Sequence, residues 1–199
     1  MASSPRDALV EIALLLLNES HPEDLSVREV ARQAGLSSGA PYHHFGDKVG
    51  LLAACAEVAW KDLCERLERT PEGATLEKSL HHYARAYVEY ALDHPGPYRL
   101  MGWRQLDDDE RFERVAMWRR RAMQGLVELV AQALGPGPGG AQPKLPWRRA
   151  MAVWALLHGH VTLVLDGSIP RAMAAGVTTE VCQMAVRMAL VPRDAEVAT

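Results

Sequence analysis

The chain has 199 residues, of which 48% are hydrophobic and 24% are charged. These proportions are ordinary for a globular protein and exclude a chain that is disordered throughout. The formal net charge of -3 argues against nucleic-acid binding through a broad positive field. Any contact with DNA must therefore depend on local geometry.

The cysteines and the apolar segments limit the cellular compartments in which the protein is expected. Three cysteines without metal-type clustering favour a reducing compartment in which the thiols are small buried apolar groups. The first residues lack the basic start and the cleavage site of a secretion signal. The longest apolar stretch, residues 150–165, is shorter than the roughly 20 residues of a membrane span and contains two histidines. We expect a cytoplasmic protein without membrane contact.

The first helices are predicted from apolar periodicity and capping residues. A first helix is expected from about Pro5 to Glu19. Ser26 opens a second helix, and Glu29 completes a capping box in which each side chain accepts from a free backbone N–H. Gly35 ends this helix because glycine readily adopts the left-handed conformation.

A third, very short helix follows at once. Ser37 or Ser38 is its expected N-cap, and Pro41 is tolerated because N–H groups of a first turn have no partner within the helix. Gly46 ends this helix, and Asp47 caps a longer fourth helix with one inward apolar stripe.

Glycine and proline then divide the remainder of the chain, which is again helical. They mark a linker at 70–73 and a flexible connection at 135–146. Five further helices are predicted, over residues 76–93, 98–103, 108–134, 147–165 and 178–190. No useful strand-type alternation is found, so the fold class is all-α. The expected domains are residues 1–68 and 74–192, followed by a tail at 193–199.

The last two predicted helices are apolar nearly all round. A helix of this kind needs packing partners on two sides. In a chain of this size, one side can meet the chain's own core and the other a second copy of the chain. The pattern therefore favours a homodimer.

Residues 26–45 match the physical description of a helix-turn-helix motif, in which two short helices are joined by a turn that contains glycine. The second helix of such a motif enters the major groove of DNA. Ser37 and Ser38 can bond to phosphates or bases, and Gly39 allows close approach. Tyr42, His43 and Lys48 can reach phosphate oxygens.

The same residues resemble a known family. The stretches LSVREVA (25–31), AGLS (34–37) and YHHF (42–45), followed by Asp47-Lys48 and Leu51-Leu52, resemble the DNA-binding domain of the TetR family of bacterial repressors. The resemblance covers about the first 65 residues. The stretches LDHPGPYRLM and AVWALLHGHVTL further resemble the helical ligand-binding and dimerisation domain of a subgroup with a Trp-His-Gly signature.

The resemblance implies a homodimer that binds a palindromic operator. It also implies a small-molecule effector in the C-terminal domain, which changes the separation of the two DNA-reading heads. Tyr42 and Lys48 fall where the family usually contacts phosphate, and residues 37–40 with His43 fall where bases are read. The expected DNA-binding residues are Arg28, Ser37, Ser38, Gly39, Ala40, Tyr42, His43 and Lys48.

Several large side chains in the second half are candidates for an effector pocket, although side chains at this spacing also build plain cores. They are Tyr87, Met101, Trp103, Phe112, Met117 and Trp154. His158 is either an effector contact or a core histidine bonded to a carbonyl.

Catalytic alternatives are weaker. The acidic run 107–110 could bind a metal or act in acid–base chemistry, but acidic residues also complement a helix start, and arginines follow to balance them. No nucleophile can be paired with a base, and no glycine-rich phosphate loop follows a strand. We expect no enzyme activity, no metal and no cofactor.

The sequence thus predicts a transcriptional repressor released from DNA by a small apolar or amphipathic molecule. Two alternatives remain open at this point. One is a helical ligand-binding protein that has lost DNA binding, and the other is a helical enzyme that uses the acidic run.

Overall fold

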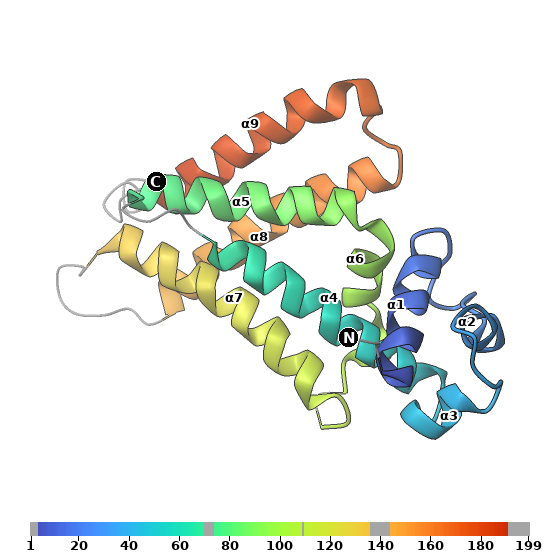
Figure 1. Cartoon of the computed structure of the whole chain (residues 1–199). Coiled ribbons are helices and arrows are strands. Elements are labelled where there is room, and N and C mark those ends of the chain that lie inside the picture. Colours follow the sequence, from blue (N-terminus) through green and yellow to red (C-terminus); the bar gives the residue numbers. More distant parts are fainter. Residues whose placement is uncertain (1–3, 70–73, 109, 136–143, 191–199) are drawn as a thin grey trace. The chain divides into compact units, whose positions relative to one another are not determined.

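The structure, a computed structural model, describes residues 4–69, 74–108, 110–135 and 144–190. Regular secondary structure within these ranges is entirely helical, which confirms the predicted all-α fold (Figure 1). No helix in this part of the chain is long and apolar enough to cross a lipid bilayer. The helices are α1 (Pro5–Leu17), α2 (Val27–Gln33), α3 (Ala40–Phe45), α4 (Lys48–Glu68), α5 (Leu76–Asp93), α6 (Pro95–Met101), the 3₁₀ turn η1 (Arg104–Leu106), α7 (Glu113–Leu134), α8 (Lys144–Leu165) and α9 (Arg171–Leu190).

The chain divides into two compact units that are interleaved in sequence. The N-terminal unit comprises Met1–Asp62 and Asp93–Arg119, and the C-terminal unit comprises Leu63–Leu92 and Arg120–Thr199. Two helices, α4 and α7, contribute residues to both units. The predicted linker at 70–73 and the predicted tail at 193–199 lie outside the described residues. The domain bounds expected from the sequence stay a prediction.

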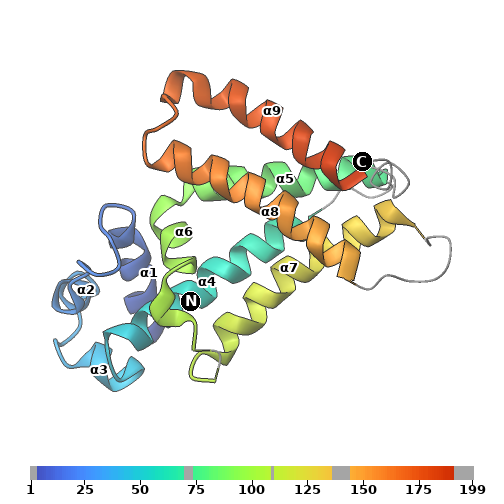
Figure 2. The same ribbon diagram turned by 180° about the vertical axis from the view of Figure 1, so that it is seen from behind.

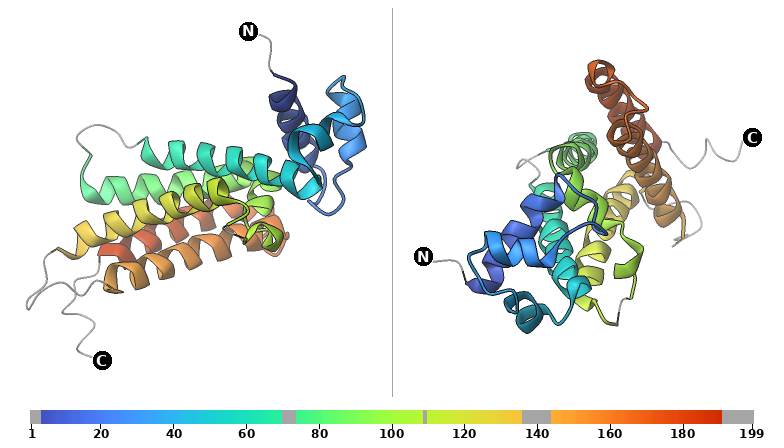
Figure 3. Two further views of the ribbon diagram at one scale, coloured as in Figure 1. Left: turned by 90° about the horizontal axis from the view of Figure 1, so that it is seen from below. Right: turned by 90° about the vertical axis from the view of Figure 1, so that its right-hand side faces the viewer.

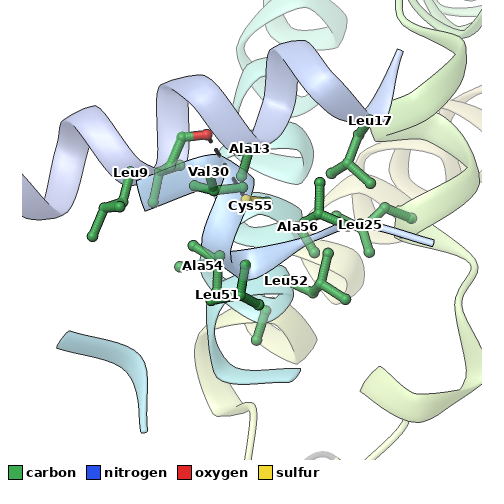
Figure 4. Close-up of a cluster of buried hydrophobic side chains, with 14 of the residues drawn as sticks. Leu9, Ala13, Leu17, Leu25, Val30, Leu51, Leu52, Ala54, Cys55 and Ala56 are labelled. Atoms are coloured by element: carbon green, nitrogen blue, oxygen red, sulfur yellow. Dashed lines mark hydrogen bonds between the residues drawn. The ribbon is translucent and has the colours of Figure 1, made fainter. Parts of the chain in front are cut away.

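The core of the N-terminal unit is built around the first turns of α4. Leu51, Leu52 and Cys55 are fully buried there, and Figure 4 shows them beside leucines of α1. Burying apolar surface of this kind is the main favourable contribution to folding. Further buried members of this core come from α1, α2 and the 93–119 segment: Leu9, Ala13, Leu17, Val30, Leu100, Leu106, Phe112 and Val115.

The cysteines are buried and carry free thiols, as the sequence predicts for small apolar core groups. Cys55 lies in the N-terminal core, where its Sγ is 3.9 Å from the carbonyl oxygen of Val10 (Figure 4). Burial raises the pKa of this thiol to about 12, so the group stays neutral.

The 93–119 segment approaches α1 most closely at Gly96. A Cβ added to Gly96 would lie 1.9 Å from the carbonyl oxygen of Leu17, closer than two such atoms can stand. The contact between α6 and α1 therefore requires a residue without a side chain at this position. It fixes the start of α6 against the end of α1.

The C-terminal unit contains a long pair of adjacent helices, α8 and α9, which lie side by side in opposite directions (Figures 2 and 3). His160 of α8 and Thr178 of α9 are joined by a hydrogen bond of 2.7 Å between Nε2 and Oγ1. His160 is almost completely buried, and burial lowers its pKa, which favours the neutral imidazole.

The predicted start of the last helix at residue 178 is wrong, because α9 begins seven residues earlier, at Arg171. The carbonyl oxygen of Pro170 accepts from the N–H groups of Met173 and Ala174, at 2.8 and 3.1 Å, and so opens the helix. The alanines that follow are strong helix formers, although their weak apolar periodicity does not reveal a helix.

Three other helix starts differ from the expected ones by three to five residues. Proline accounts for two of these differences, since it is compatible with a first helical turn, where no intrahelical N–H bond is needed. Part of the predicted 135–146 connection is therefore helical, while residues 136–143 lie outside the described residues. The observed starts are Pro95 for α6, Glu113 for α7 and Lys144 for α8.

We expect Gly96→Ala to lower the free energy of unfolding by about 1–3 kcal/mol, because the added methyl group forces α6 away from α1. Gly102→Ala is the matched control, since a Cβ there would lie 3.9 Å from the Arg99 carbonyl oxygen, an ordinary van der Waals distance. Urea denaturation of the two variants measures the difference. Equal midpoints for both would contradict the close contact.

Candidate nucleic-acid interface

The supporting helix of the predicted helix-turn-helix motif is α2. The Ser26 hydroxyl accepts from the backbone N–H of Glu29 at 3.3 Å, which confirms Ser26 as the N-cap. The reciprocal half of the capping box is wrong, because the Glu29 carboxylate accepts from Arg32 at 2.8 Å and from Gln33 at 2.7 Å instead. These two donors, Arg32 first, lower the pKa of Glu29 to about 2.

The turn between α2 and α3 is set by Gly35, which has a φ of +69° as the sequence predicts. The Leu36 N–H donates to the Ala31 carbonyl oxygen at 2.9 Å, and the Gly35 N–H donates to the Arg32 carbonyl oxygen at 3.2 Å. This pair of bonds is the Schellman motif, which satisfies the last carbonyl groups of a helix while reversing the chain. The chain is thus free to begin α3 in a new direction.

The N-cap of α3 differs from the expected one. Gly39 occupies this position and makes no side-chain capping bond, so the prediction of Ser37 or Ser38 as the cap is wrong. The backbone makes the connection instead, since the Ala40 N–H donates to the Ser37 carbonyl oxygen at 3.0 Å. Both serines are exposed, and neither hydroxyl is used to start the helix.

The orientation of α3 is seen from which of its side chains are buried and which are exposed. Pro41, in the first turn, is buried against the rest of the unit. Tyr42 is 51% exposed, and His43 beside it is also exposed. A helix held by its apolar side in this way leaves Tyr42 and His43 at the surface of the unit.

The corner between α3 and α4 is held by Asp47, the predicted cap of the fourth helix. Its Oδ1 accepts from the Gly50 N–H at 2.7 Å, and its Oδ2 accepts from Arg111 at 2.6 Å. The Gly50 N–H in the first place, with Arg111 contributing, holds the pKa of Asp47 below its usual range. The carboxylate therefore joins the start of α4 to the segment that precedes α7.

Lys48, a predicted phosphate contact, is half-buried next to this corner. Its Nζ donates to the carbonyl oxygen of Glu23, in the connection between α1 and α2. The Glu23 carboxylate in turn accepts from Trp103 Nε1 at 2.8 Å. The ammonium group is thus positioned by a backbone carbonyl oxygen. Arg28, the remaining predicted cation of the interface, is exposed on α2.

The predicted effector residues fall into two groups. Four belong to the N-terminal unit: Met101 and Phe112 are buried, Trp103 donates to Glu23, and Met117 is exposed on α7. Phe112 and Trp103 are part of the core around α4 or pack against it. The other three belong to the C-terminal unit.

Those three, Tyr87, Trp154 and His158, form one cluster. The Tyr87 hydroxyl lies 3.3 Å from Nδ1 of His158, and the rings of Trp154 and His158 are stacked with centroids 4.9 Å apart. Burial lowers the pKa of His158, which favours its neutral form. The Tyr87 hydroxyl is thus one hydrogen-bond partner of the His158 ring.

Two long-range ion pairs of the N-terminal unit were not predicted. Arg111 binds Asp47, and Arg114 binds Glu57 with Nε 2.7 Å from the carboxylate oxygen. Charge patterning predicts that these arginines balance the neighbouring acids, and Arg119 does pair with that run, with its Nη1 3.0 Å from Asp107 Oδ1. For the pairs Arg111–Asp47 and Arg114–Glu57, the sequence shows only that charged residues are present and does not indicate which of them meet.

The acidic run at 107–110 supports structure in the described part of the chain. Asp107 binds Arg119, and the Asp108 carboxylate accepts from the backbone N–H of Arg111 at 3.1 Å. The pairing of Asp107 with Arg119 agrees with the predicted balance of charge, but the predicted helix start at this run is wrong, because α7 begins at Glu113. Asp109 lies outside the described residues.

Comparison with known proteins gives matches over both halves of the chain. The family described as "Bacterial regulatory proteins, tetR family" matches residues 9–55, and the family described as "Tetracyclin repressor-like, C-terminal domain" matches residues 80–189. An uncharacterized helix-turn-helix-type transcriptional regulator of Mycobacterium tuberculosis is 28% identical over 166 residues, which are 83% of this chain and 72% of the relative.

Two solved structures have the same fold. A protein of unknown function from Rhodococcus sp. RHA1 has a TM-score of 0.74 and 29% identity, with 94% of this chain and 95% of that chain covered. A tetR-family transcriptional regulator from Streptomyces coelicolor has a TM-score of 0.71 and 24% identity, with 94% and 82% covered.

Asp47→Ala should lower the free energy of unfolding by about 0.5–2 kcal/mol at neutral pH, because it removes the cap of α4. Asp47→Asn, which keeps an acceptor for the Gly50 N–H, is expected to lose less. Since the pKa of Asp47 is lowered in the folded protein, its contribution is present above the ordinary carboxyl pKa of about 3.9 and is lost as pH falls through the folded value.

Denaturant titrations of the three proteins at neutral and acidic pH measure both effects. The gap between the wild type and Asp47→Ala should narrow in acid. An equal loss in the Asn and Ala variants would show that the capping bond is not the cause.

Proposed function

Because the chain belongs to the TetR family of bacterial transcriptional regulators, we propose that it is a repressor that binds a palindromic operator as a homodimer and is released by a small molecule. DNA-binding transcription regulation, and no enzymatic reaction, is the activity of the family and of the curated relative. The observation that carries the proposal is the α2–α3 motif, in which Gly35 turns the chain and α3 presents Tyr42 and His43 outward.

The division of labour on DNA follows from where each group lies. The α3 helix enters the major groove, with residues 37–40 and His43 near base edges. Arg28, Tyr42 and Lys48 contact phosphates, which position the protein without reading sequence. The hydrogen bond from Lys48 to the Glu23 carbonyl oxygen supports this role, because it preorients a point charge beside the helix.

The α8–α9 pair of the C-terminal unit forms the dimer interface. Several large apolar side chains on these helices are exposed in the single chain, among them Leu163 at 48%, Met173 at 60% and Met184 at 54%. A second copy that packs the same two helices against them buries these side chains in a two-fold interface. Such a dimer presents two copies of α3 to half-sites about 34 Å apart on one face of DNA.

The effector acts through the C-terminal unit. The cluster of Tyr87, Trp154 and His158 provides aromatic surface and neutral polar atoms suited to an apolar or amphipathic molecule. A differential affinity of about 1–3 kcal/mol between the DNA-bound and released forms is enough to change operator affinity several-fold to hundredfold. A rotation of the reading heads out of register with the half-sites lowers affinity without local unfolding.

A titration of the full chain with DNA from upstream of its own gene, at several salt concentrations, tests the proposal. Fluorescence anisotropy should show tight binding that weakens steeply with salt, because phosphate contacts release counterions. Binding to no double-stranded fragment, even in dilute buffer, would exclude the proposed function.

Lys48→Ala should weaken binding to all DNA sequences about equally and reduce the slope of log affinity against log salt by about 1. His43→Ala should change the preference among operator variants and leave that slope nearly unchanged. Lys78→Ala, which removes an exposed cation on α5, is the control for loss of charge alone. The same response in the Lys48 and His43 variants would refute the division into positioning and reading residues.

Met184→Glu should convert the dimer into monomers, because it places a charge in the proposed two-fold interface, and operator binding should weaken with it. Leu15→Glu is the matched control, since Leu15 is 59% exposed on α1 of the other unit. Sedimentation velocity measures the oligomeric state of both variants. A dimer that survives Met184→Glu with unchanged affinity would place the interface elsewhere.

A further inference from the structure

A cleft of ≈ 170 Å³ lies in the C-terminal unit, between residues of α4, α5 and α7. Its apolar wall includes Leu67 of α4 and Ala122 and Leu129 of α7. Tyr83 of α5 also lines it, and the Tyr83 hydroxyl donates to the Ala122 carbonyl oxygen at 3.1 Å. With this hydroxyl occupied, Tyr83 contributes mainly the apolar surface of its ring.

Gly125 lines this cleft, and the space that a side chain at this position would occupy is part of it. Gly125 lies in the middle of α7, and a Cβ added there would have no neighbour within 4 Å. Glycine inside a helix is less favourable than alanine, and nothing in the neighbouring packing requires it here. The absence of a side chain therefore keeps the cleft open.

The volume of the cleft sets the size of its contents. A cavity of about 150 Å³ lined by apolar side chains holds one benzene molecule. The cleft of ≈ 170 Å³ thus accommodates a body of about one six-membered ring.

The polar rim of the cleft is an ion pair between Arg121 and Glu68. Nε and Nη2 of Arg121 donate to the two carboxylate oxygens of Glu68, at 2.7 and 2.9 Å. The two side chains are 55% and 51% exposed, and ion pairs at such exposure contribute little to stability. The geometry shows how a planar carboxylate fits the guanidinium group.

Of the two partners, Glu68 is the easier to exchange. It is the last residue of α4, where the negative end of the helix dipole opposes a carboxylate. Arg121 projects from within α7 and carries its charge at all relevant pH values. A second carboxylate can replace that of Glu68 on Arg121 while Glu68 returns to water.

Cys64 completes the cleft as a neutral wall. Burial raises the pKa of this thiol to about 11, so it neither repels an anion nor acts as a nucleophile at neutral pH. It adds a polarizable apolar contact for a ring.

We propose that this cleft binds a compact monocarboxylate, whose ring-sized apolar body lies over Gly125 and whose carboxylate takes the place of Glu68 on Arg121. The site is separate from the Tyr87, Trp154 and His158 cluster, because the residues that line it are different. Only the regulatory consequence of binding, a change in operator affinity, rests on the proposed function.

Isothermal titration calorimetry of the full chain with benzoate tests the binding. We expect saturable binding of one benzoate per chain with a dissociation constant of about 1 mM or lower. Benzamide has the same ring without the charge and should bind at least about tenfold more weakly, and acetate, which lacks the ring, should not saturate.

Gly125→Leu should weaken benzoate binding at least about tenfold by filling the cleft, while the better helix former keeps α7 intact. Ala131→Leu is the matched control, because Ala131 is exposed on the same helix and does not line the cleft. Arg121→Gln should weaken benzoate binding about as much as Gly125→Leu, and Glu68→Gln, which removes the competing carboxylate, should leave it equal or tighter. Circular dichroism and thermal unfolding verify that each variant is folded.

The proposal is overturned if benzoate does not saturate the wild type, if benzamide binds as tightly as benzoate, or if Gly125→Leu and Ala131→Leu bind benzoate equally. Anisotropy with the upstream DNA, with and without saturating benzoate, separates the proposal from the proposed function. If benzoate binding changes in the variants as predicted but the chain does not bind DNA, the ligand site is supported and the proposed repressor function is refuted. Conversely, a chain that binds the upstream DNA but does not bind benzoate would support the repressor function and refute the proposed ligand site.

Discussion

The Asp47 carboxylate joins the two parts of the chain on which the orientation of α3 depends. It caps α4 immediately after α3 ends, and it accepts from Arg111, which lies 64 residues further along the chain. Because both partners are exposed, the ion pair itself contributes little energy, and burial around Leu51 and Leu52 supplies most of the stability. The contribution of Asp47 is position: it fixes where one helix ends and the next begins.

A helix as short as α3 depends on such support. Six residues make fewer than two turns, and an isolated helix of that length does not form in water. Buried Pro41 attaches α3 to the core, and the Schellman turn at Gly35 attaches its other side to α2. The tertiary structure thereby holds a small exposed surface rigid, which favours recognition because little conformational entropy remains to be lost on binding.

The charge distribution is consistent with this local mode of recognition. A protein of net charge -3 gains no long-range attraction to DNA from its overall field. In the proposed function, Lys48, Arg28 and the polar side chains near α3 therefore act at short range, where the hydrogen bond of Lys48 to the Glu23 carbonyl oxygen orients its charge. In the C-terminal unit, buried His160 binds Thr178, and burial lowers the pKa of His158, which favours the neutral imidazole.

The sequence by itself determined the helices that local rules define. Apolar periodicity with Ser26, Gly35, Gly46 and Asp47 located α2, α3 and the start of α4, since caps and helical turns join residues three to five positions apart. The family motif in the same stretch indicated DNA binding. The start of α9 was not predicted correctly, because the alanines in its first turns show no strong apolar periodicity.

Only the tertiary structure decided which of several local partners each side chain uses, and which distant segments meet. It assigned the Glu29 carboxylate to Arg32, left Ser37 and Ser38 out of the cap of α3, and paired Arg111 with Asp47 across the fold. It also placed residues 93–119 in one compact unit with the first 62 residues. The physical reason is that packing of the whole core sets these distances, whereas a pattern of residue types records only neighbours along the helix.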